Sequence, residues 1–333
     1  MMRALLTIAL MPNGLLALSG GFSRKVLRHH HAPPARTNHV LAMKAPAARF
    51  KVTDGGSNAR AAMLMEKHQF PLGLAQQAVA SAAYFPVRHW IVDNSGSMSA
   101  GDGNLLGKDA AGANKTVRGT RWQEISADID VVADISHDIG ARTEFLPLNG
   151  ALRPLTIQGT NEGDVAKVSK GLATLEPRAG YTTPLAAATT RIYLSILPKL
   201  QALMKNQQQA CVVIATDGKP TDNGFQEALK QLQTLPVWVV IRLCTDDEEV
   251  VDYYNGLDAK LEAPLEVLDD LRGEAREVCT LNRFITYGQP LQIARQFGMR
   301  NCVFDEIDER PLKPGQVKNF CELLLGGNPL PEP

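Results

Sequence analysis

Hydrophobic positions along this chain follow two alternating patterns. Short, continuous apolar runs at residues 86–92, 211–216 and 237–243 contain many β-branched residues and predict buried strands. Residues 122–139 instead carry isoleucines and a valine three or four positions apart, at Ile125, Ile129, Val132, Ile135 and Ile139. That spacing predicts an amphipathic helix. Strands that alternate with helices are typical of an α/β domain.

The remaining segments extend the same alternation. Further helices are predicted at residues 61–68, 72–83, 165–172, 184–197, 225–235, 246–261, 276–297 and 316–325. Other features are a hairpin around Asn149-Gly150, a short strand at residues 265–268 and a glycine-rich loop from Ser99 to Gly119. We therefore expect a doubly wound, mostly parallel central sheet with helices on both faces, and a site at the carboxyl ends of its strands.

Composition narrows the class of protein. The 333 residues are 44% hydrophobic and 21% charged, as in soluble globular domains, and 35 basic residues balance 35 acidic ones. Without a basic excess, nucleic-acid binding is not expected, and without an apolar run of 18 residues a stable membrane span is not expected either. The five cysteines are widely spaced and form no CxxC pair, so neither a disulfide framework nor a zinc site is predicted.

The first 53 residues differ from the rest of the chain. They contain eight basic residues and no Asp or Glu, which leaves the remainder with a net charge of −8. Met1-Met2-Arg3 followed by the mostly apolar residues 4–18 is typical of a secretory signal, and the basic stretch after it is also typical of a plastid-type leader. The alternative is a solvated tail on a cytoplasmic protein. His29-His30-His31 also lies here, but three adjacent side chains cannot all face one ion on a regular element.

Oxygen-bearing side chains gather in three segments that the predicted topology brings to one edge of the sheet. In chain order they are Asp93, Ser95, Ser97, Thr183 and Asp217. Such hard donors suit Mg²⁺ or Mn²⁺, and less well Ca²⁺, rather than Zn²⁺ or Cu²⁺. With only two carboxylates, a bound ion would keep waters and could accept an acidic side chain from another molecule. Gly96 and Gly218 are expected to let the two strand-end loops bend tightly.

These motifs resemble the metal-ion-dependent adhesion site of von Willebrand factor type A domains. The DxSxS pattern at residues 93–97, a threonine before Pro184-Leu185, and Asp217-Gly218 occur in the family order. The resemblance implies that Ser95, Ser97 and Thr183 contact a metal ion directly, and that Asp93 and Asp217 act directly or through waters. Thr182 competes with Thr183, which we prefer because it stands immediately before the Pro-Leu step.

The resemblance also divides the chain. It covers residues 86–305, with residues 1–55 as a leader or disordered targeting segment, 56–85 as a helical extension, and 306–333 as a C-terminal helix and tail. The chain departs from the family in the long glycine-rich segment after Ser97 and in an enlarged, acidic region at residues 246–273.

The resemblance implies a non-catalytic interaction module whose bound ion engages an Asp or Glu of a protein partner. No catalytic residue is predicted, because the chain has neither a GxSxG elbow nor a GxxxxGK[ST] phosphate loop, and His68, His89 and His137 lack an HExxH spacing and are expected to be structural or exposed. One alternative is a metal-assisted hydrolase with Asp217 or Asp222 as general base, although Asp222 is better explained as a helix cap. Another is an assembly subunit of an ATPase or chelatase complex.

Overall fold

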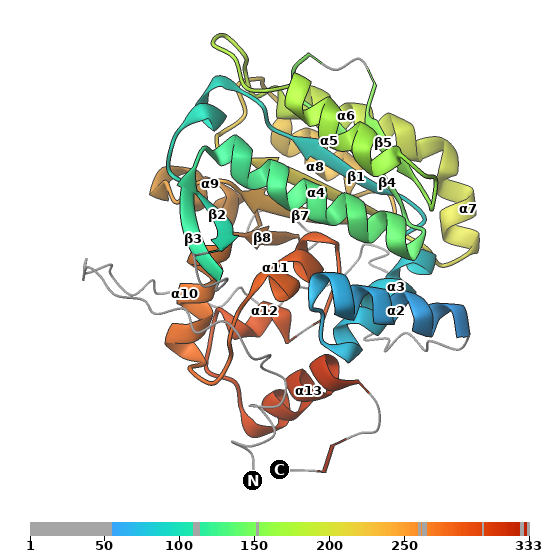
Figure 1. Cartoon of the computed structure of the whole chain (residues 1–333). Coiled ribbons are helices and arrows are strands. Elements are labelled where there is room, and N and C mark those ends of the chain that lie inside the picture. Colours follow the sequence, from blue (N-terminus) through green and yellow to red (C-terminus); the bar gives the residue numbers. More distant parts are fainter. Residues whose placement is uncertain are drawn as a thin grey trace.

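The computed structural model describes residues 55–108, 114–150, 153–258, 261, 265–301, 303–326 and 330–331, so the expected leader at residues 1–53 lies outside the described residues. Within this part of the chain, six strands form one sheet in the order β5-β4-β1-β6-β7-β8 (Figure 1). Its strands are β1 (Arg88–Val92), β4 (Arg142–Pro147), β5 (Leu155–Gln158), β6 (Ala210–Thr216), β7 (Val237–Leu243) and β8 (Glu266–Leu268).

The sheet is parallel except for its edge pair β4–β5. β1 lies between β4 and β6, with Val92 opposite Ala215. The chain first builds β4 and β5 on one side of β1 and then crosses to β6 on the other side, so the strand order reverses between β1 and β6. Ligands of doubly wound sheets bind at such a switch point. The predicted fold class is confirmed.

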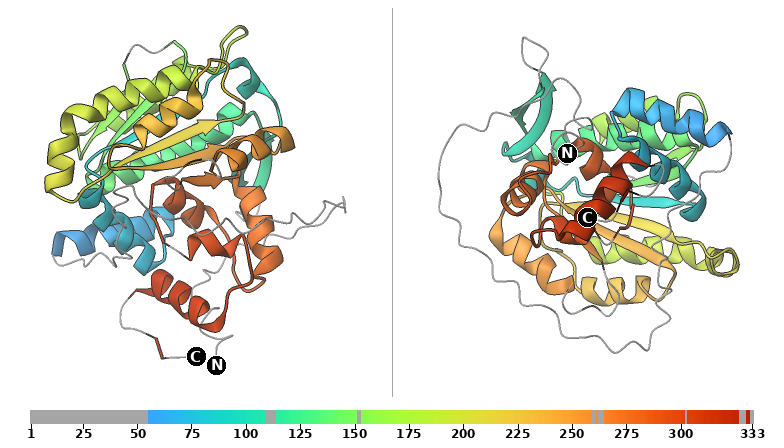
Figure 2. Two further views of the ribbon diagram at one scale, coloured as in Figure 1. Left: turned by 180° about the vertical axis from the view of Figure 1, so that it is seen from behind. Right: turned by 90° about the horizontal axis from the view of Figure 1, so that it is seen from below.

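Helices cover both faces of the sheet. One face carries α2 (Gly55–His68), α3 (Leu72–Tyr84), α4 (Arg121–Ile139), α5 (Asp164–Thr174), α10 (Leu271–Leu281), α11 (Gln289–Gln296), α12 (Phe304–Ile307) and α13 (Pro314–Leu325). The other carries α6 (Leu185–Ile196), the 3-10 turn η2 (Leu197–Lys199), α7 (Leu200–Lys205), α8 (Phe225–Leu232) and α9 (Glu248–Asp258). The last helix, α13, packs beside α3, where the Leu323 carbonyl leaves no room for a β-carbon on Gly73 (Figure 2). Among the described helices, none is long and apolar enough to cross a bilayer.

Alternate residues of the central strands enter opposite cores, as the pleat of a strand requires. In β1, Trp90 and Val92 belong to the core that includes α4, and Ile91 belongs to the core that includes α6. All seven residues of β6 are buried. Burial of one such apolar side chain contributes roughly 1.5–3 kcal/mol, so this double core fixes the strand ends and the loops that follow them.

The helix predicted at residues 122–139 is present as α4, with clear signals at both ends. Thr120 and Gln123 form a capping box, in which the Thr120 hydroxyl accepts from the Gln123 N–H and the Gln123 side chain accepts from the Thr120 N–H. Gly140 ends the helix with a φ of 73°. The cap places Arg121 at the first turn of α4, beside the carboxyl end of the sheet.

Two predictions of local structure were wrong. The stretch expected as a loop from Ser99 to Gly119 contains a hairpin of β2 (Gly103–Lys108) and β3 (Asn114–Gly119), preceded by the 3-10 turn η1 (Gly96–Ser99). The strands are stabilised by cross-strand pairs such as Leu105 with Val117 and by packing of β2 on α4. The glycines in this segment had led to the prediction of a loop. The single helix expected at 276–297 is two helices, α10 and α11, because Pro290 fits only the first turn of a helix.

Candidate metal centre

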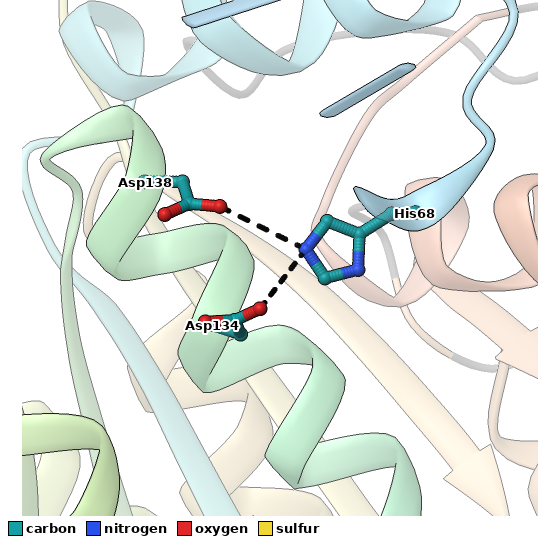
Figure 3. Close-up of side chains that lie close together, drawn as sticks. All are labelled: His68, Asp134 and Asp138. Carbon is teal, nitrogen blue, oxygen red and sulfur yellow. Dashed lines mark ion pairs between the residues drawn. The ribbon is translucent and has the colours of Figure 1, made fainter. Parts of the chain in front are cut away.

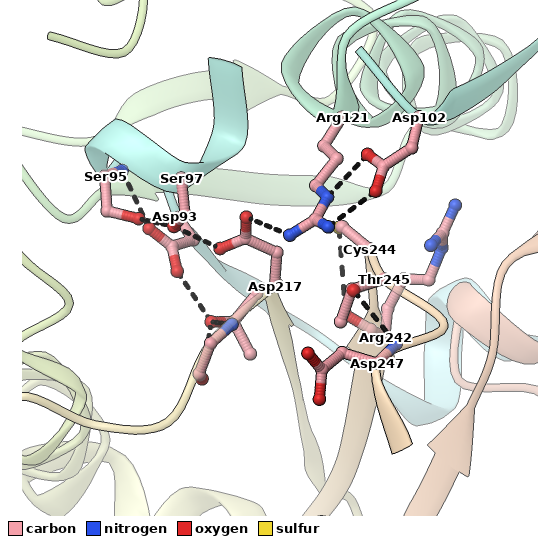
Figure 4. Close-up of polar contacts among 12 residues, drawn as sticks. Asp93, Ser95, Ser97, Asp102, Arg121, Asp217, Arg242, Cys244, Thr245 and Asp247 are labelled. Atoms are coloured by element: carbon pink, nitrogen blue, oxygen red, sulfur yellow. Dashed lines mark hydrogen bonds and ion pairs between the residues drawn. The ribbon is translucent and has the colours of Figure 1, made fainter. Parts of the chain in front are cut away.

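The predicted site residues that follow β1 and β6 lie side by side at the switch point of the sheet (Figure 4). The Asp93 N–H donates to the Ala215 carbonyl at 2.9 Å, which extends the parallel pairing one residue beyond β1. Asp217 follows β6 directly. After β1 the chain continues to α4 on one face of the sheet, and after β6 it continues to α8 on the other face. The loops that follow β1 and β6 therefore start side by side and lead to opposite faces.

Asp93 is fully buried and both of its oxygens accept hydrogen bonds. Oδ1 accepts from the Ser95 N–H at 2.8 Å, and Oδ2 accepts from the Thr216 hydroxyl at 2.6 Å. Burial raises the pKa of Asp93 to about 6; the hydrogen bonds from Thr216 and Ser95 partly oppose this shift, and the nearby charge of Asp217 adds to it. A carboxylate in this environment is stabilised by a nearby cation.

Three oxygen atoms run in a row from Ser95 to Asp217. The hydroxyls of Ser95 and Ser97 are 3.0 Å apart, and the Ser97 hydroxyl donates to Oδ1 of Asp217 at 2.8 Å. In octahedral Mg²⁺ sites, with bonds of 2.0–2.1 Å, adjacent ligands lie about 3 Å apart. The donors therefore fit Mg²⁺ in their chemistry, as hard oxygens, and in their spacing.

The segment with Thr183 packs against the loop after β1. The Gly96 N–H donates to the Tyr181 carbonyl at 3.3 Å. Thr183 is buried, its N–H donates to the Thr221 hydroxyl, and its carbonyl accepts from the Thr221 N–H, both at 3.0 Å. Among the described residues, Asp93, Ser95, Ser97 and Asp217 are thus joined by hydrogen bonds of their side chains. The backbone of Thr183 instead bonds to Thr221 and Leu185, so the contacts found do not join Thr183 to the other four residues.

Sequence reasoning missed Arg121, which contacts the site directly. Its Nη1 donates to Oδ2 of Asp217 at 2.9 Å, and its Nε and Nη2 donate to the two oxygens of Asp102 at 2.8 and 2.6 Å (Figure 4). Both carboxylates raise the pKa of Arg121, so it remains charged. Its position just before the predicted helix was visible in the sequence, but its carboxylate partners were not.

The hairpin β2–β3 determines where Asp102 lies. The Asn104 N–H donates to Oε2 of Glu124 at 2.7 Å, and Glu124 forms an ion pair with Arg242, which is 1% exposed and lies on β7. Through this pair the hairpin is fixed to both α4 and the sheet. The described parts of the glycine-rich segment after Ser97, β2 and β3, therefore form a rim beside the site.

Asn94, inside the DxSxS motif, joins the loop after β1 to two other segments. Its Nδ2 donates to the carbonyls of Asn149 and Leu175, each at 3.0 Å, and its Oδ1 accepts from the Asn149 N–H at 2.9 Å. Asn94 is fully buried. Asn94 therefore fixes the position of the loop that carries Asp93 and Ser95.

Asp222 is a helix cap, although not of the helix that follows it. Its Oδ1 and Oδ2 accept from the N–H groups of Ala186 and Ala187 at 3.0 and 2.8 Å, so it caps α6 rather than α8. Among the histidines, His89 is buried in β1 with Nδ1 3.1 Å from Oε2 of Glu144. The cap expected at Asp222 is confirmed, although on a different helix, and His89 is buried rather than exposed.

Gly96 and Gly218 were expected to let the two strand-end loops bend tightly. Neither Gly96 nor Gly218 has a positive φ, and a β-carbon on Gly218 would meet nothing within 4 Å. The left-handed residue near the site is Gly180, with a φ of 86°, just before Tyr181. The backbone conformation that requires glycine therefore lies in the threonine segment, not in the two loops with the aspartates.

Comparisons with known proteins give a weak similarity. No protein-family profile and no curated protein sequence matches the chain. An aerotolerance-related membrane protein from Bacteroides fragilis is 15% identical, with a TM-score of 0.41, over 64% of this chain and 99% of that chain. A von Willebrand factor type A structure from Catenulispora acidiphila is 16% identical, with a TM-score of 0.36, over 63% of this chain and 40% of that chain. At this level of similarity, function has to be inferred from the residues of the chain itself.

Proposed function

We propose that this protein binds Mg²⁺ or Mn²⁺ through Asp93, Ser95, Ser97, Thr183 and Asp217, and uses the ion to bind an Asp or Glu side chain of a protein partner. The observation that supports this most directly is the row of oxygen donors Ser95, Ser97 and Asp217, with separations of 3.0 and 2.8 Å. The order of the sequence motifs, which resembles that of type A adhesion sites, supports the same ligand set.

The contacts suggest a separate role for each carboxylate. Asp217 would bind the ion through Oδ1, because Arg121 already occupies Oδ2. Such a contact from outside the ligand shell orients a ligand and typically affects metal affinity 10–100-fold. Asp93, whose oxygens both accept hydrogen bonds, would act through its charge and through water. With only two carboxylates in the set, a bound divalent ion would keep water ligands, one of which an acidic side chain of a partner can replace.

The contacts of the aspartates favour an interaction role over a hydrolase. Both oxygens of Asp222 accept backbone N–H groups of α6, and Asp217 has Oδ2 paired with Arg121 and Oδ1 assigned to the proposed ion. A general base needs a lone pair that can take a proton from water. The alternative of an assembly subunit in an ATPase complex is compatible with the proposed function, because such a subunit would bind its partner through the same ion site.

Calorimetric titration of the full-length protein with MgCl₂ and MnCl₂ tests the ion site. Ser97 and Ser99 lie in the same 3-10 turn and both are exposed, but only Ser97 contacts the site, so Ser99→Ala is a matched control for Ser97→Ala. We expect one-site binding in the wild type and in Ser99→Ala, and at least about tenfold weaker binding in Ser97→Ala. Wild-type protein that binds neither ion, or Ser97→Ala with unchanged affinity, would contradict the proposed site.

Affinity capture with the same three proteins tests the partner. We expect a partner that is retained with Mg²⁺, released by EDTA, lost with Ser97→Ala and retained with Ser99→Ala. An ATP-binding protein among the captured chains would place the module in an ATPase complex. Partners that bind equally with EDTA and with Ser97→Ala would show that the interaction is not bridged by metal.

A further inference from the structure

A histidine and two aspartates meet where α2 packs against α4, away from the strand ends (Figure 3). His68 is the last residue of α2, and Asp134 and Asp138 are four positions apart on α4 and so lie on one side of that helix. Nε2 of His68 lies 3.3 Å from Oδ2 of Asp134 and 3.9 Å from Oδ2 of Asp138. We refer to these three residues as the α2–α4 cluster.

The imidazole of His68 points into this cluster, with Nε2 near both carboxylates. Its side chain is 10% exposed, and Nε2 is buried without a hydrogen bond to any described residue. A neutral ring nitrogen with its lone pair beside two carboxylate oxygens is unfavourable unless a cation or a proton lies between them.

The three ligand atoms lie within 4.8 Å of one another, and the two separations from His68 are close to those of a tetrahedral site. With metal–ligand bonds of 2.0–2.2 Å, as in zinc sites, two ligand atoms lie about 3.4 Å apart. The contact of His68 with Asp134 is already at 3.3 Å, and that with Asp138 would need to shorten only slightly from 3.9 Å. Asp134 is 37% exposed, which gives an ion access from solvent and leaves room for a water ligand.

We propose that the α2–α4 cluster is a second metal site, which binds Zn²⁺ or a similar first-row transition ion through His68, Asp134 and Asp138. Its imidazole ligand distinguishes it from the all-oxygen site at the strand ends, because nitrogen ligands favour Zn²⁺ over Mg²⁺. A bound ion would join the end of α2 to the last turns of α4 and so fix the N-terminal helices on the α/β domain. This inference is independent of the proposed partner-binding function.

Lys67 competes with an ion for the same place. Its Nζ donates to both oxygens of Asp138, at 3.0 and 2.9 Å, and its side chain is 45% exposed. The flexible ammonium can therefore turn toward solvent when a divalent ion takes over Asp138. His137 lies near the other side of the same carboxylate, with Nδ1 3.5 Å from Oδ1, and does not belong to the cluster.

Zinc titration of the full-length protein tests the proposal. His29, His30 and His31 are first replaced by alanine in every variant, because adjacent histidines in the leader can bind Zn²⁺ on their own. In this background we compare no further change, His68→Ala, His137→Ala and Lys67→Met, and follow Zn²⁺ binding by competition with a chromophoric chelator. The rise in melting temperature on addition of Zn²⁺ is the second readout.

We expect one Zn²⁺ per chain in the background protein and in His137→Ala, and at least about tenfold weaker binding in His68→Ala. Lys67→Met should bind more tightly, because it removes the competing ammonium and keeps the apolar part of the side chain. If His68→Ala fails to fold, Asp134→Asn replaces it, since the partly exposed Asp134 tolerates an amide. Background protein without saturable binding, or with binding unchanged by His68→Ala or Asp134→Asn, overturns the proposal. Ser97→Ala should leave Zn²⁺ binding unchanged, which separates this test from that of the Mg²⁺ site.

Discussion

Asp217 and Asp138 each lie at a proposed cation site, and each is paired with a basic side chain, but in different ways. Arg121 contacts only Oδ2 of Asp217 and is itself fixed by a two-point contact with Asp102. Lys67 contacts both oxygens of Asp138, including the one that faces His68. An ion at the strand ends can therefore bind beside Arg121, whereas an ion in the α2–α4 cluster must displace Lys67.

The two regions also differ in the atoms they offer. The strand ends present serine hydroxyls and carboxylates, which are hard ligands. The α2–α4 cluster adds the ring nitrogen of His68 to two carboxylates. Similar pairs of aspartates can thus favour different ions, because the neighbouring atoms and the basic side chain differ. Variants that affect one region and spare the other test this comparison.

The largest effect is expected for Asp217→Asn. The amide keeps the shape of the side chain but removes the negative charge that the proposed ion contacts, while Arg121 stays paired with Asp102. We expect Mg²⁺ affinity to fall by about 100-fold or more, whereas Zn²⁺ binding at the α2–α4 cluster stays within about twofold of the wild type. Calorimetric titrations with both ions measure this, and an equal loss of both affinities would show that the regions are not independent.

The next effect is on stability and comes from Asp138→Asn. The Asp138 side chain is 1% exposed, and its carboxylate accepts from Lys67 and faces His68. Loss of this partly buried charged hydrogen bond should lower the free energy of unfolding by about 2 kcal/mol. Urea unfolding measures the change, and Asp134→Asn, at a carboxylate that is 37% exposed, should cost clearly less. If the two variants lose the same free energy of unfolding, the burial of a carboxylate does not determine how much it contributes to stability.

The strand-end site could be predicted from the sequence and the α2–α4 cluster could not, for a physical reason. Asp93, Ser95 and Ser97 lie within five residues, and their strand has a clear apolar pattern, so topology alone brings them toward the end of β6. Lys67 and Asp138 are 71 positions apart, and their contact depends on how α2 packs on α4. Patterns within one segment do not determine which helices become neighbours.

Arg121 and the hairpin show the same limit at the edge of the predicted site. The helix that begins at Arg121 was predicted to within one residue, but its guanidinium finds Asp102 only because the segment after Ser97 folds back as β2 and β3. Because that segment is rich in glycine, its sequence did not predict strands. The oxygen donors at the strand ends could therefore be located from the sequence, whereas the residues that contact them, such as Arg121, could not.

A smaller effect is expected for Asp222→Ala, which removes the cap of α6. Its two oxygens accept the N–H groups of Ala186 and Ala187, and loss of such a cap typically costs about 1 kcal/mol. We expect that decrease in unfolding free energy, measured in urea, together with unchanged Mg²⁺ affinity. A large loss of Mg²⁺ binding would instead show that Asp222 belongs to the ion site, which would revive its consideration as a general base.

The last effect depends on pH and is expected for Glu144→Gln, at a histidine–carboxylate pair with one carboxylate. The close contact with His89, aided by Arg142, lowers the pKa of Glu144 from 4.5 to about 2. Because the folded state binds this proton less readily than the unfolded state, the pair stabilises the fold above pH 4.5, and this contribution is lost as the pH falls from 4.5 to 2. The melting temperature of Glu144→Gln should therefore lie below that of the wild type at pH 7, and the two should converge as the pH falls toward 2. If the melting temperatures of the two proteins differ by the same amount at every pH below 4.5, the charge of Glu144 contributes nothing to stability through this pair.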